Sequence, residues 1–319
     1  MKKPEYECDL HTHTTASDGH KLPKELIDAA VADGIVVLGI TDHDVVLKNR
    51  KELILYAKEK GVHLLPGIEI SCDTENDDVH VIGYGCRWNS TYFEQLKQDV
   101  RKSRYFGYKE LVKRLDDNGY PLDFDEILKY GGNEENPYGI MKKQIYEYMA
   151  VKGYAKTWND AKVFVLSDET YAVKRRKPDP VDTISQIHNT GGIAILAHPF
   201  LIAEQVKYKN KSMNRMEYID ILIEAGLDGI EACYPYHKSS YQGVEDSHRI
   251  EHIIKSRYAD KIRFFSGGSD YHGDDIKQAE NPRLLGEKGV SFSYFRDKIW
   301  KALSDTYEMK QEKKVQDGN

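Results

Sequence analysis

The chain has 319 residues, of which 40% are hydrophobic and 31% are charged, and its formal net charge is −6. A chain of this length can bury a full core without cross-links, and the composition is typical of a globular protein. No apolar run reaches membrane-spanning length, so we expect no membrane span. The N-terminus lacks an apolar leader, so we expect no secretory signal. The negative net charge argues against binding to duplex DNA.

The first part of the chain alternates between strand and helix patterns. Apolar or β-branched runs predict strands at Tyr6–His11, Ile35–Thr41, Val62–Glu69 and Val79–Tyr84. Helical periodicity predicts helices at Leu22–Asp33 and Asn49–Lys60, each followed by a glycine that can end it. This alternation favours a parallel α/β architecture.

The middle of the chain has a different character. Residues 87–178 are rich in tyrosine and charged side chains and lack a strong strand pattern. Helices are predicted there at Tyr92–Asn118, Asp123–Tyr130, Ile140–Lys152 and Trp158–Val165. We interpret residues 87–178 as a helical insertion or lid domain within a discontinuous barrel domain, residues 1–86 and 179–308, with a polar tail at 309–319.

The strand–helix alternation returns after the insertion. Helices are predicted at Val181–Asn189, Arg215–Ala225 and Ser247–Arg257, and strands at Ile193–Ala197, Gly229–Ala232 and Arg263–Ser266. The four cysteines, Cys8, Cys72, Cys86 and Cys233, are scattered and form no Cys-x-x-Cys pair. Free thiols of this kind predict a cytoplasmic protein.

Histidines and carboxylates follow almost every predicted strand. In parallel α/β barrels the carboxyl ends of the strands share one face, so residues that are distant in sequence can converge there. In His11-Thr12-His13 the strand alternation would direct both rings to one side. Imidazole and carboxylate groups bind zinc, manganese and iron, and a carboxylate such as Glu69 can bridge two ions. Each motif alone also has a structural interpretation, but together they predict a metal site.

These motifs, in this order, resemble those of the PHP (polymerase and histidinol phosphatase) family of the amidohydrolase superfamily. The matching stretches are DLHTHTTASDG, GITDHD, GIEI, His80 before IGYG, LAHP and GGSDYHG. The helical insertion resembles that of the stand-alone metal-dependent phosphoesterases of this family. The resemblance implies an α/β fold, a distorted TIM-like (β/α)7 barrel with a helical insertion domain.

The resemblance also implies three divalent metal ions, with manganese as the first choice and iron or zinc as alternatives. Carried over residue by residue, one ion would be bound by His11, His13, Glu69 and Asp270, a second by Glu69, His80 and His198, and the third by Asp18, His43 and His272. All nine positions have the expected residue types.

Further residues are predicted to assist the metal ligands. His237, in Tyr-Pro-Tyr-His, resembles a position near the phosphate in related enzymes and could protonate the leaving oxygen, or it could be an exposed loop histidine. Asp42 is a catalytic candidate because it could orient the neighbouring His43. Asp9 is a weaker candidate of the same kind, and Glu231 either supports the site or forms a salt bridge.

Substrate-binding residues are expected on the insertion. Its cations could contact phosphate groups, and the candidates are Arg101, Arg104, Lys142, Lys143 and Lys174. Tyr171 resembles a position that could stack on a base or sugar, although simple packing is the alternative. Related nucleotide phosphatases carry an Arg-x-His-Phe-like stretch where this chain has Ile140–Ile145, with lysines in place of arginine and histidine. This departure leaves the exact substrate open.

Together, the motifs and the resemblance imply a metal-dependent phosphoesterase that uses metal-activated hydroxide. The expected substrates are small phosphorylated molecules, either nucleoside 3′,5′-bisphosphates or short RNA 5′ ends. One alternative is a phosphodiesterase for cyclic sugar phosphates of the ribose 1,2-cyclic phosphate type. Another is a non-catalytic barrel that binds metals or nucleotides.

Overall fold

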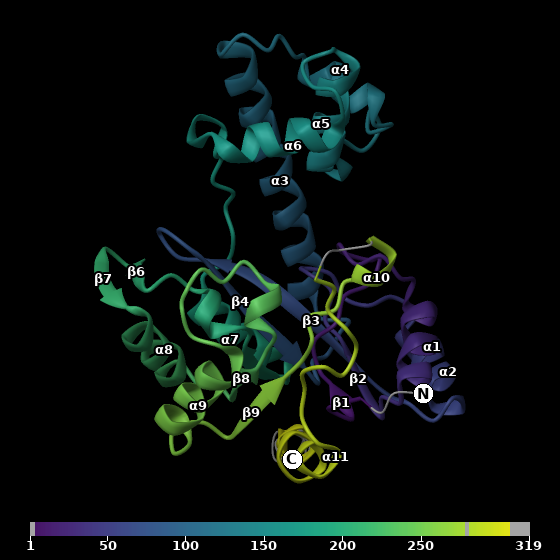
Figure 1. The fold of residues 1–319 in the computed structure, drawn as a ribbon, viewed down its shortest axis with the longest axis vertical. Coiled ribbons are helices and arrows are strands. Elements are labelled where there is room, and N and C mark those ends of the chain that lie inside the picture. The colour runs from purple at the N-terminus through teal and green to yellow at the C-terminus, as the bar shows by residue number, and fades with distance from the viewer. Residues whose placement is uncertain (1–3, 278–280, 307–319) are drawn as a thin grey trace, which may run out of the picture. The chain divides into compact units, whose positions relative to one another are not determined.

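The computed structural model describes residues 4–277 and 281–306, and its central feature is a seven-stranded sheet (Figure 1). In sheet order the strands are β1 (Cys8–Asp9), β2 (Val37–Ile40), β3 (His63–Asp73), β4 (Asp78–Tyr84), β5 (Ile193–Leu196), β8 (Gly229–Cys233) and β9 (Phe264–Gly267). The sheet curls until its edges meet, because Leu10 N donates to Gly267 O at 3.2 Å and His13 N donates to Tyr271 O at 2.9 Å. This nearly closed barrel confirms the predicted fold class.

Strand direction departs from a fully parallel barrel at β4. β1, β2 and β3 are parallel, as are β5, β8 and β9, but β4 is antiparallel to both β3 and β5. The physical reason is the short turn between Asp73 and Asp78, since a tight turn can join only antiparallel strands. The predicted parallel arrangement is therefore wrong at this strand.

Helices flank the sheet as the periodicity predicts. They are α1 (Pro23–Asp33), α2 (Arg50–Glu59), α7 (Pro180–Thr190), α8 (Arg215–Glu224) and α9 (Ser247–Tyr258) (Figure 1). α7 illustrates the local causes: the Asp179 side chain accepts hydrogen bonds from the first helical N–H groups, and Gly191 ends the helix with φ +84°. Its apolar residues Ile184 and Ile187 are fully buried. Further along, α11 (Phe292–Tyr294) continues into a π-helical turn, η5 (Phe295–Trp300).

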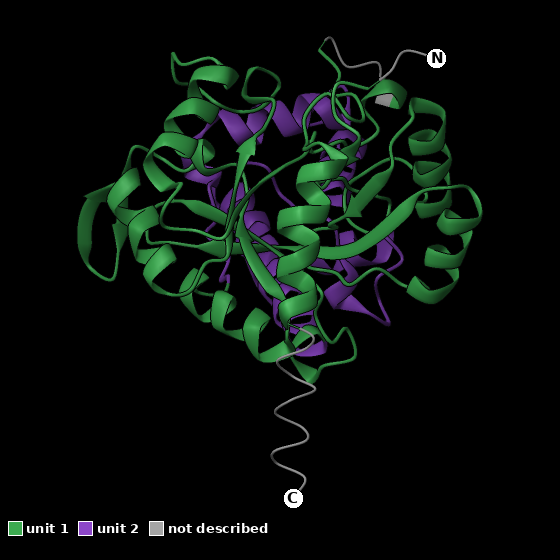
Figure 2. Cartoon of the chain, turned by 90° about the horizontal axis from the view of Figure 1, so that it is seen from below, with its two compact units in different colours: residues 1–93, 178–319 green, residues 94–177 purple. Residues whose placement is uncertain are grey.

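The chain forms two compact units, shown in different colours in Figure 2. We call Met1–Phe93 with Pro178–Asn319 the barrel unit, and Glu94–Lys177 the insertion unit. The proposed polar tail at 309–319 lies outside the described residues. Two further strands, β6 (Gln205–Tyr208) and β7 (Lys211–Asn214), form a hairpin in the barrel unit that the sequence analysis did not predict.

The insertion unit has a hydrophobic core of its own. Its helices are most of α3 (Thr91–Asp117), then α4 (Phe124–Tyr130), α5 (Lys142–Val151) and α6 (Trp158–Ser167). Leu111, Leu115, Ile127, Ile145 and Met149 are fully buried in one cluster. Residues 94–177 are all described and contain no strand, as predicted. Within the described ranges, no helix combines the length and the apolar character that crossing a membrane requires.

Candidate metal centre

The nine predicted ligands lie together in the barrel unit. They come from the segments after β1, β2, β5 and β9 and from within β3 and β4, and side-chain contacts of 3.0–3.9 Å connect all of them. The barrel thus brings together residues that are up to 261 positions apart, from His11 to His272. The geometry suits the binding of metal ions.

Glu69 is the central carboxylate of this cluster. Its Oε1 lies 3.0 Å from Nδ1 of His80 and 3.0 Å from Nε2 of His198. Its Oε2 lies 3.0 Å from Nδ1 of His43 and 3.3 Å from both rings of the His-x-His motif after β1. The side chain is fully buried, and its two oxygens face different sets of imidazoles. This is the arrangement in which one carboxylate can bridge two ions.

A second group forms around Asp18. Its Oδ1 lies 3.3 Å from Nε2 of His272, and its Oδ2 lies 3.9 Å from Nε2 of His43. The ring of His13 stacks on that of His272 with centroids 4.2 Å apart. These four residues offer ligand atoms that all lie within 4.8 Å of one another. The structure therefore adds His13 to the three residues that the resemblance implies for the third ion.

Buried atoms of the cluster test whether metal ions fit. Nε2 of His11, both ring nitrogens of His13, Nδ1 of His43 and Oε2 of Glu69 form no hydrogen bond with any described residue. A buried polar atom left unsatisfied costs about 1–3 kcal/mol. Divalent cations would satisfy imidazole nitrogens and carboxylate oxygens together, so the residues present fit such ions.

The charges in the cluster also suit cations. Burial alone would raise the pKa of Glu69, but the surrounding histidines, His43 first, hold it well below the usual range. Burial, helped by His13 and His80, lowers the pKa of His43 to about 3, so this ring is neutral with a free lone pair. Against the effect of burial, Asp270 and Glu69 raise the pKa of His13 to about 9. Metal binding would have to displace that proton.

Glu231 supports the ligands without joining them. Its Oε1 lies 3.1 Å from Nδ1 of His11, and its Oε2 accepts a hydrogen bond from the backbone N–H of His198 at 2.8 Å. It is nearly fully buried. These contacts to two predicted ligands favour the supporting role among the two that the sequence left open.

Asp42 holds a loop. Its carboxylate accepts hydrogen bonds from Thr14 N at 2.7 Å, Thr14 Oγ1 at 2.8 Å and Ser17 Oγ at 2.7 Å. These contacts fix the segment that carries Asp18, whereas the prediction had Asp42 orient His43. Asp9 accepts from Ser269 N at 2.9 Å and so ties β1 to the segment after β9.

His237 follows β8, and among the described residues its side chain contacts Ser247 rather than a predicted ligand. It is an exposed residue of η4 (Tyr236–Lys238), the turn after β8. Its Nδ1 is 3.4 Å from Oγ of Ser247, the first residue of α9. Its role as a proton donor stays a prediction.

The predicted substrate-binding residues all belong to the insertion unit. Arg101 and Arg104 lie on α3, Lys142 and Lys143 on α5, Tyr171 in η2 (Glu169–Tyr171) and Lys174 just after it. Lys143 pairs with Glu147 at 3.4 Å, and burial together with Arg175 and Lys162 lowers the pKa of Lys142.

Tyr171 has a packing role in this unit. It is 5% exposed, and its ring lies 5.4 Å from that of Phe164 and 6.5 Å from that of Tyr120, centroid to centroid. The ring belongs to the hydrophobic core cluster of the insertion unit. Packing, the alternative that the sequence left open, therefore describes Tyr171.

Two residues that the sequence analysis did not select contact the ligand Asp270. Tyr234 donates from its hydroxyl to Asp270 Oδ2 at 2.8 Å, and Arg283 donates to the same oxygen at 2.7 Å. Tyr234 directly follows β8, so its position at a strand end was the available signal. Arg283 lies outside any helix or strand and carries no motif.

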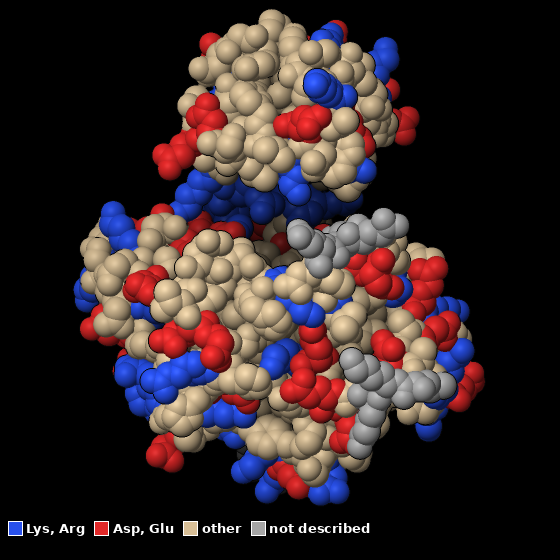
Figure 3. Space-filling view, viewed as in Figure 1, with Lys and Arg blue, Asp and Glu red and all other residues tan. Residues whose placement is uncertain are grey.

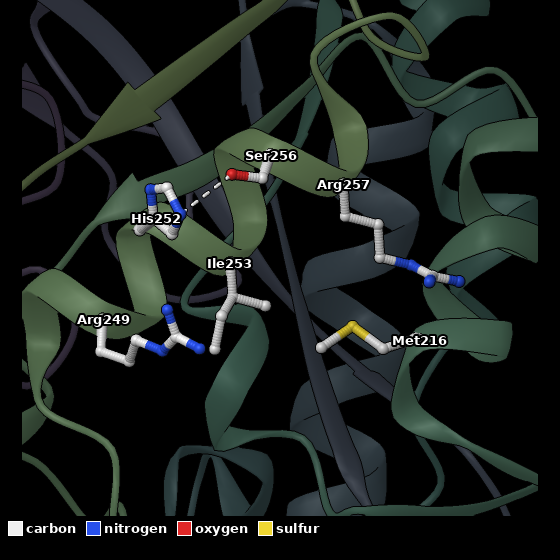
Figure 4. Close-up of a pocket in the computed structure, with 6 residues that line it drawn as sticks. All are labelled: Met216, Arg249, His252, Ile253, Ser256 and Arg257. Carbon is white, nitrogen blue, oxygen red and sulfur yellow. Dashed lines mark hydrogen bonds between the residues drawn. The ribbon is translucent and has the colours of Figure 1, made fainter.

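A surface groove of about 570 Å³ lies on outer helices of the barrel unit, α8 and α9 (Figure 4). It is lined by Met216, Arg249, His252, Ile253, Ser256 and Arg257. None of the nine clustered residues lines it and no carboxylate is present, so it does not share the metal chemistry. On the face in Figure 3, acidic and basic side chains are interspersed over the barrel unit.

Comparisons with known proteins agree with this chemistry. The family model of the PHP domain matches residues 9–185, more than half of the chain. A 5′-3′ exoribonuclease of Haemophilus influenzae is 32% identical over 194 residues, which are 60% of this chain and 68% of the relative. A 3′,5′-nucleoside bisphosphate phosphatase of Chromobacterium violaceum is 24% identical over 283 residues, 86% of this chain and 91% of the relative.

Two further similarities extend over most of the chain. A phosphoribosyl 1,2-cyclic phosphate 1,2-diphosphodiesterase of Eggerthella lenta is 26% identical over 275 residues, 83% of this chain and 94% of the relative. The crystal structure of a Bifidobacterium adolescentis protein assigned to the metal-dependent phosphoesterases superimposes with a TM-score of 0.66 and 25% identity. It covers 93% of this chain and 97% of that one.

Proposed function

Because this chain belongs to the PHP family and is a metal-dependent phosphoesterase, we propose that it hydrolyses phosphate esters of small nucleotides. The proposed substrates are nucleoside 3′,5′-bisphosphates and the 5′ ends of short RNAs. The observation that carries this proposal is the cluster of nine ligands around the buried carboxylate of Glu69. The bisphosphatase and exoribonuclease relatives support the substrate class.

We propose that three divalent ions, manganese first, occupy this cluster. The first ion would be held by His11, His13, Glu69 and Asp270, and the second by Glu69, His80 and His198. The third would be held by Asp18, His43 and His272, and His13 lies close to this last group. When bound, such ions lower the pKa of water toward neutrality and offset the negative charge of the phosphoryl oxygens. The unpaired buried atoms of the cluster support this occupancy.

The chain's own groups complete the proposed reaction. Glu69 and Asp270 stay ionised because the surrounding histidines, and Arg283 beside Asp270, keep the pKa of each carboxyl well below its usual range. Glu231 keeps the His11 ring oriented, and Asp42 keeps the loop of Asp18 in place. We propose that His237 donates the proton that the leaving oxygen needs.

We propose that cations of the insertion unit bind the substrate's phosphate groups. The candidates remain Arg101, Arg104, Lys142, Lys143 and Lys174. Lys142 supports this idea best, because its depressed pKa reflects burial next to two other cations, Arg175 and Lys162. Like charges held close together favour an anionic ligand.

A second candidate is a cyclic sugar-phosphate phosphodiesterase. The Eggerthella lenta relative, whose name carries this activity, aligns over 83% of the chain. Lys142 and Lys143 stand where related nucleotide phosphatases have arginine and histidine. This departure from the nucleotide-phosphatase pattern is also compatible with a pentose substrate.

The cysteines support a cytoplasmic location, which we also propose. Cys8, Cys72, Cys86 and Cys233 are all free and buried. Free thiols persist in a reducing compartment, whereas secreted proteins commonly use disulfides.

A direct comparison of substrates tests the proposed function. Manganese-loaded protein is assayed for phosphate release from adenosine 3′,5′-bisphosphate and from ribose 5-phosphate 1,2-cyclic phosphate. We expect faster release from the bisphosphate, and loss of at least about 100-fold in the variants Glu69→Gln and His198→Ala, because both remove ligands. Preference for the cyclic sugar would select the second candidate. Undiminished turnover in both variants would refute the assignment of the site.

A further inference from the structure

Asp270 occupies an unusual backbone conformation. Its φ is +51°, in the left-handed region that side chains other than glycine rarely adopt. Such a conformation persists only where surrounding contacts hold it, and it is found most often at functional sites. In this chain, the residue that must be held is one of the two carboxylates at the centre of the cluster.

Arg283 holds both the backbone and the side chain of Asp270. A single nitrogen, Nη1, donates to the carbonyl oxygen of Asp270 at 2.6 Å and to its Oδ2 at 2.7 Å. The backbone N–H of Arg283 donates to Oδ2 of Asp274 at 3.0 Å, which anchors the arginine's own segment. Tyr234 adds a second donor to Asp270 Oδ2 at 2.8 Å.

The hydrogen bonds from Arg283 and Tyr234 determine which oxygen of Asp270 faces the proposed metal ligands. Because Oδ2 is taken by Arg283 and Tyr234, Oδ1 is the oxygen turned toward the rings. It lies 3.1 Å from Nε2 of His13 and 3.5 Å from Nε2 of His11. The carboxylate is thereby fixed as a ligand through one oxygen.

The backbone of Asp270 also contacts His272, a proposed ligand in the group around Asp18. The carbonyl oxygen of Asp270 lies 2.8 Å from Nδ1 of His272. A carbonyl only accepts, and both hydrogens of Arg283 Nη1 are directed to oxygens of Asp270, so Nδ1 of His272 carries a proton. Nε2, 3.3 Å from Asp18, is then the nitrogen left for a metal ion. Holding the Asp270 backbone therefore also sets the tautomer of His272.

We propose that Arg283 is a positioning residue that clamps Asp270 and thereby aligns both ligand groups for metal binding. This inference rests on the metal site of the proposed function but not on the identity of the substrate. The Arg283 guanidinium is 16% exposed and lies 3.3 Å from the Nδ1 of His272, so it belongs to the layer directly behind the ligands. Partners in this layer tune metal affinity as well as ligand orientation.

The test compares Arg283→Met with Arg283→Lys after removal of all metal by a chelator. Titration with Mn²⁺ alone, followed by calorimetry, gives affinity and stoichiometry, and kcat and KM are measured separately. We expect Arg283→Met to bind Mn²⁺ about 10–100-fold more weakly and to lose kcat with little change in KM. Arg283→Lys should recover part of the affinity, because one ammonium can replace the single Nη1 that makes both contacts.

Arg263→Met is the matched control. Arg263 also pairs with a buried aspartate, Asp228, at 3.0 Å, but neither residue contacts a ligand of the cluster. We expect its Mn²⁺ affinity and stoichiometry to equal those of the unmodified protein.

The outcomes separate the inference from the proposed function. Unchanged Mn²⁺ binding in folded Arg283→Met overturns the proposal that Arg283 positions Asp270. The proposal is equally overturned if KM rises while Mn²⁺ binding stays unchanged. If Arg283→Met does not fold, Arg283→Lys combined with Tyr234→Phe carries the test, and unchanged Mn²⁺ binding in that protein overturns the clamp as well. If the unmodified protein binds Mn²⁺ but hydrolyses no phosphoester, the proposed function fails while the clamp is still measured.

Discussion

At the scale of single residues, Glu231 determines which nitrogen of His11 is available to a metal ion. Its oxygens lie 3.1 and 3.3 Å from Nδ1 of His11. An ionised carboxylate only accepts, so Nδ1 carries a proton, and Nε2, which faces Glu69 at 3.3 Å, is the nitrogen left for a metal ion. A histidine ligand oriented by a carboxylate in this way is a common arrangement in metal sites.

Replacing Glu231 with Gln should therefore weaken metal binding although the side chain keeps its shape. The amide oxygen would keep accepting from His198 N, and the amide NH₂ would then face Nδ1 of His11 as a donor. His11 would shift its proton to Nε2, the nitrogen that a metal ion needs. We expect a 10–100-fold loss of Mn²⁺ affinity, measured by calorimetry.

Glu52→Gln provides the comparison for this prediction. Glu52 pairs with Lys24 at 2.6 Å on the exposed surface of the barrel unit and should leave Mn²⁺ affinity unchanged. Equal Mn²⁺ affinities for Glu231→Gln and the unmodified protein would show that Glu231 does not set the His11 tautomer.

The residues of the site differ in how well sequence predicts them. Seven of the nine proposed ligands follow the ends of β1, β2, β5 and β9, whereas Glu69 and His80 lie within β3 and β4. All nine belong to motifs of recognisable residue type, so their convergence could be inferred. Asp42 was expected beside His43, but neighbouring residues at a strand end point to opposite sides, and its carboxylate bonds Thr14 and Ser17. Arg283 could not be found because its role depends on a loop reaching Asp270, and no periodic pattern encodes that approach.

At the scale of elements, Asp228 joins three of them at the start of β8. Its carboxylate lies 2.8 Å from Nε2 of His188 in α7, accepts from Ala194 N in β5 at 2.9 Å, and pairs with Arg263, just before β9, at 3.0 Å. Burial alone would raise the pKa of Asp228, but these partners, His188 first, lower it below the usual value.

Asp228→Asn should lower the free energy of unfolding by about 1–3 kcal/mol at pH 7, because it weakens charge-assisted hydrogen bonds at a buried site. A carboxyl whose folded pKa is depressed stabilises the protein fully above its unfolded pKa of about 3.9 and loses this effect as pH falls through the folded pKa. The difference between the two proteins should therefore narrow below about pH 4.

Urea unfolding at pH 7 and in acid measures this difference. Asp297→Asn, which removes an exposed carboxylate paired with its neighbour Arg296, should change stability little at either pH. A difference between Asp228→Asn and the unmodified protein that persists undiminished in acid would contradict the assigned direction of the shift.

Element boundaries followed from periodicity and end signals, whereas two features of the sheet did not. The helix expected at Asn49–Lys60 spans Arg50–Glu59, for instance, and ends before a glycine. The β6–β7 hairpin was missed because Gln205–Asn214 is mostly polar and its strands are only four residues long. The available signs were the alternation in Gln205–Tyr208 and the Lys209-Asn210 turn, where φ is positive at both residues. The direction of β4 depends on the length of its turn, which an apolar run does not reveal.

At the scale of the whole molecule, the ligands and the insertion belong to different units. All nine ligands lie in the barrel unit, and residues 94–177 form a separate unit with their own buried cluster. A bound ion stabilises only the structure that holds it, so metal should raise the stability of the barrel unit more than that of the insertion unit.

Hydrogen exchange with and without Mn²⁺ tests this division. At a free concentration about 100 times its Kd, the metal adds about 2.7 kcal/mol to the stability of the form that binds it. We expect exchange in β3, β5 and β9 to slow by up to about 100-fold on that basis, with amides of residues 94–177 much less affected. Removing the metal with a chelator should reverse the change. Equal protection in both units would mean that metal binding orders the insertion as well.

The position of the insertion also has a consequence for the order in which the site is made. Six ligands, from His11 to His80, precede residues 94–177 in the chain, whereas His198, Asp270 and His272 follow them. Arg283, the proposed clamp of Asp270, is translated later still. A ribosome that has completed the insertion has therefore made two thirds of the proposed ligands and none of the three proposed ion sites in full. With this ligand set, synthesis from the N-terminus delays metal-dependent hydrolysis until the segment after β9 has emerged.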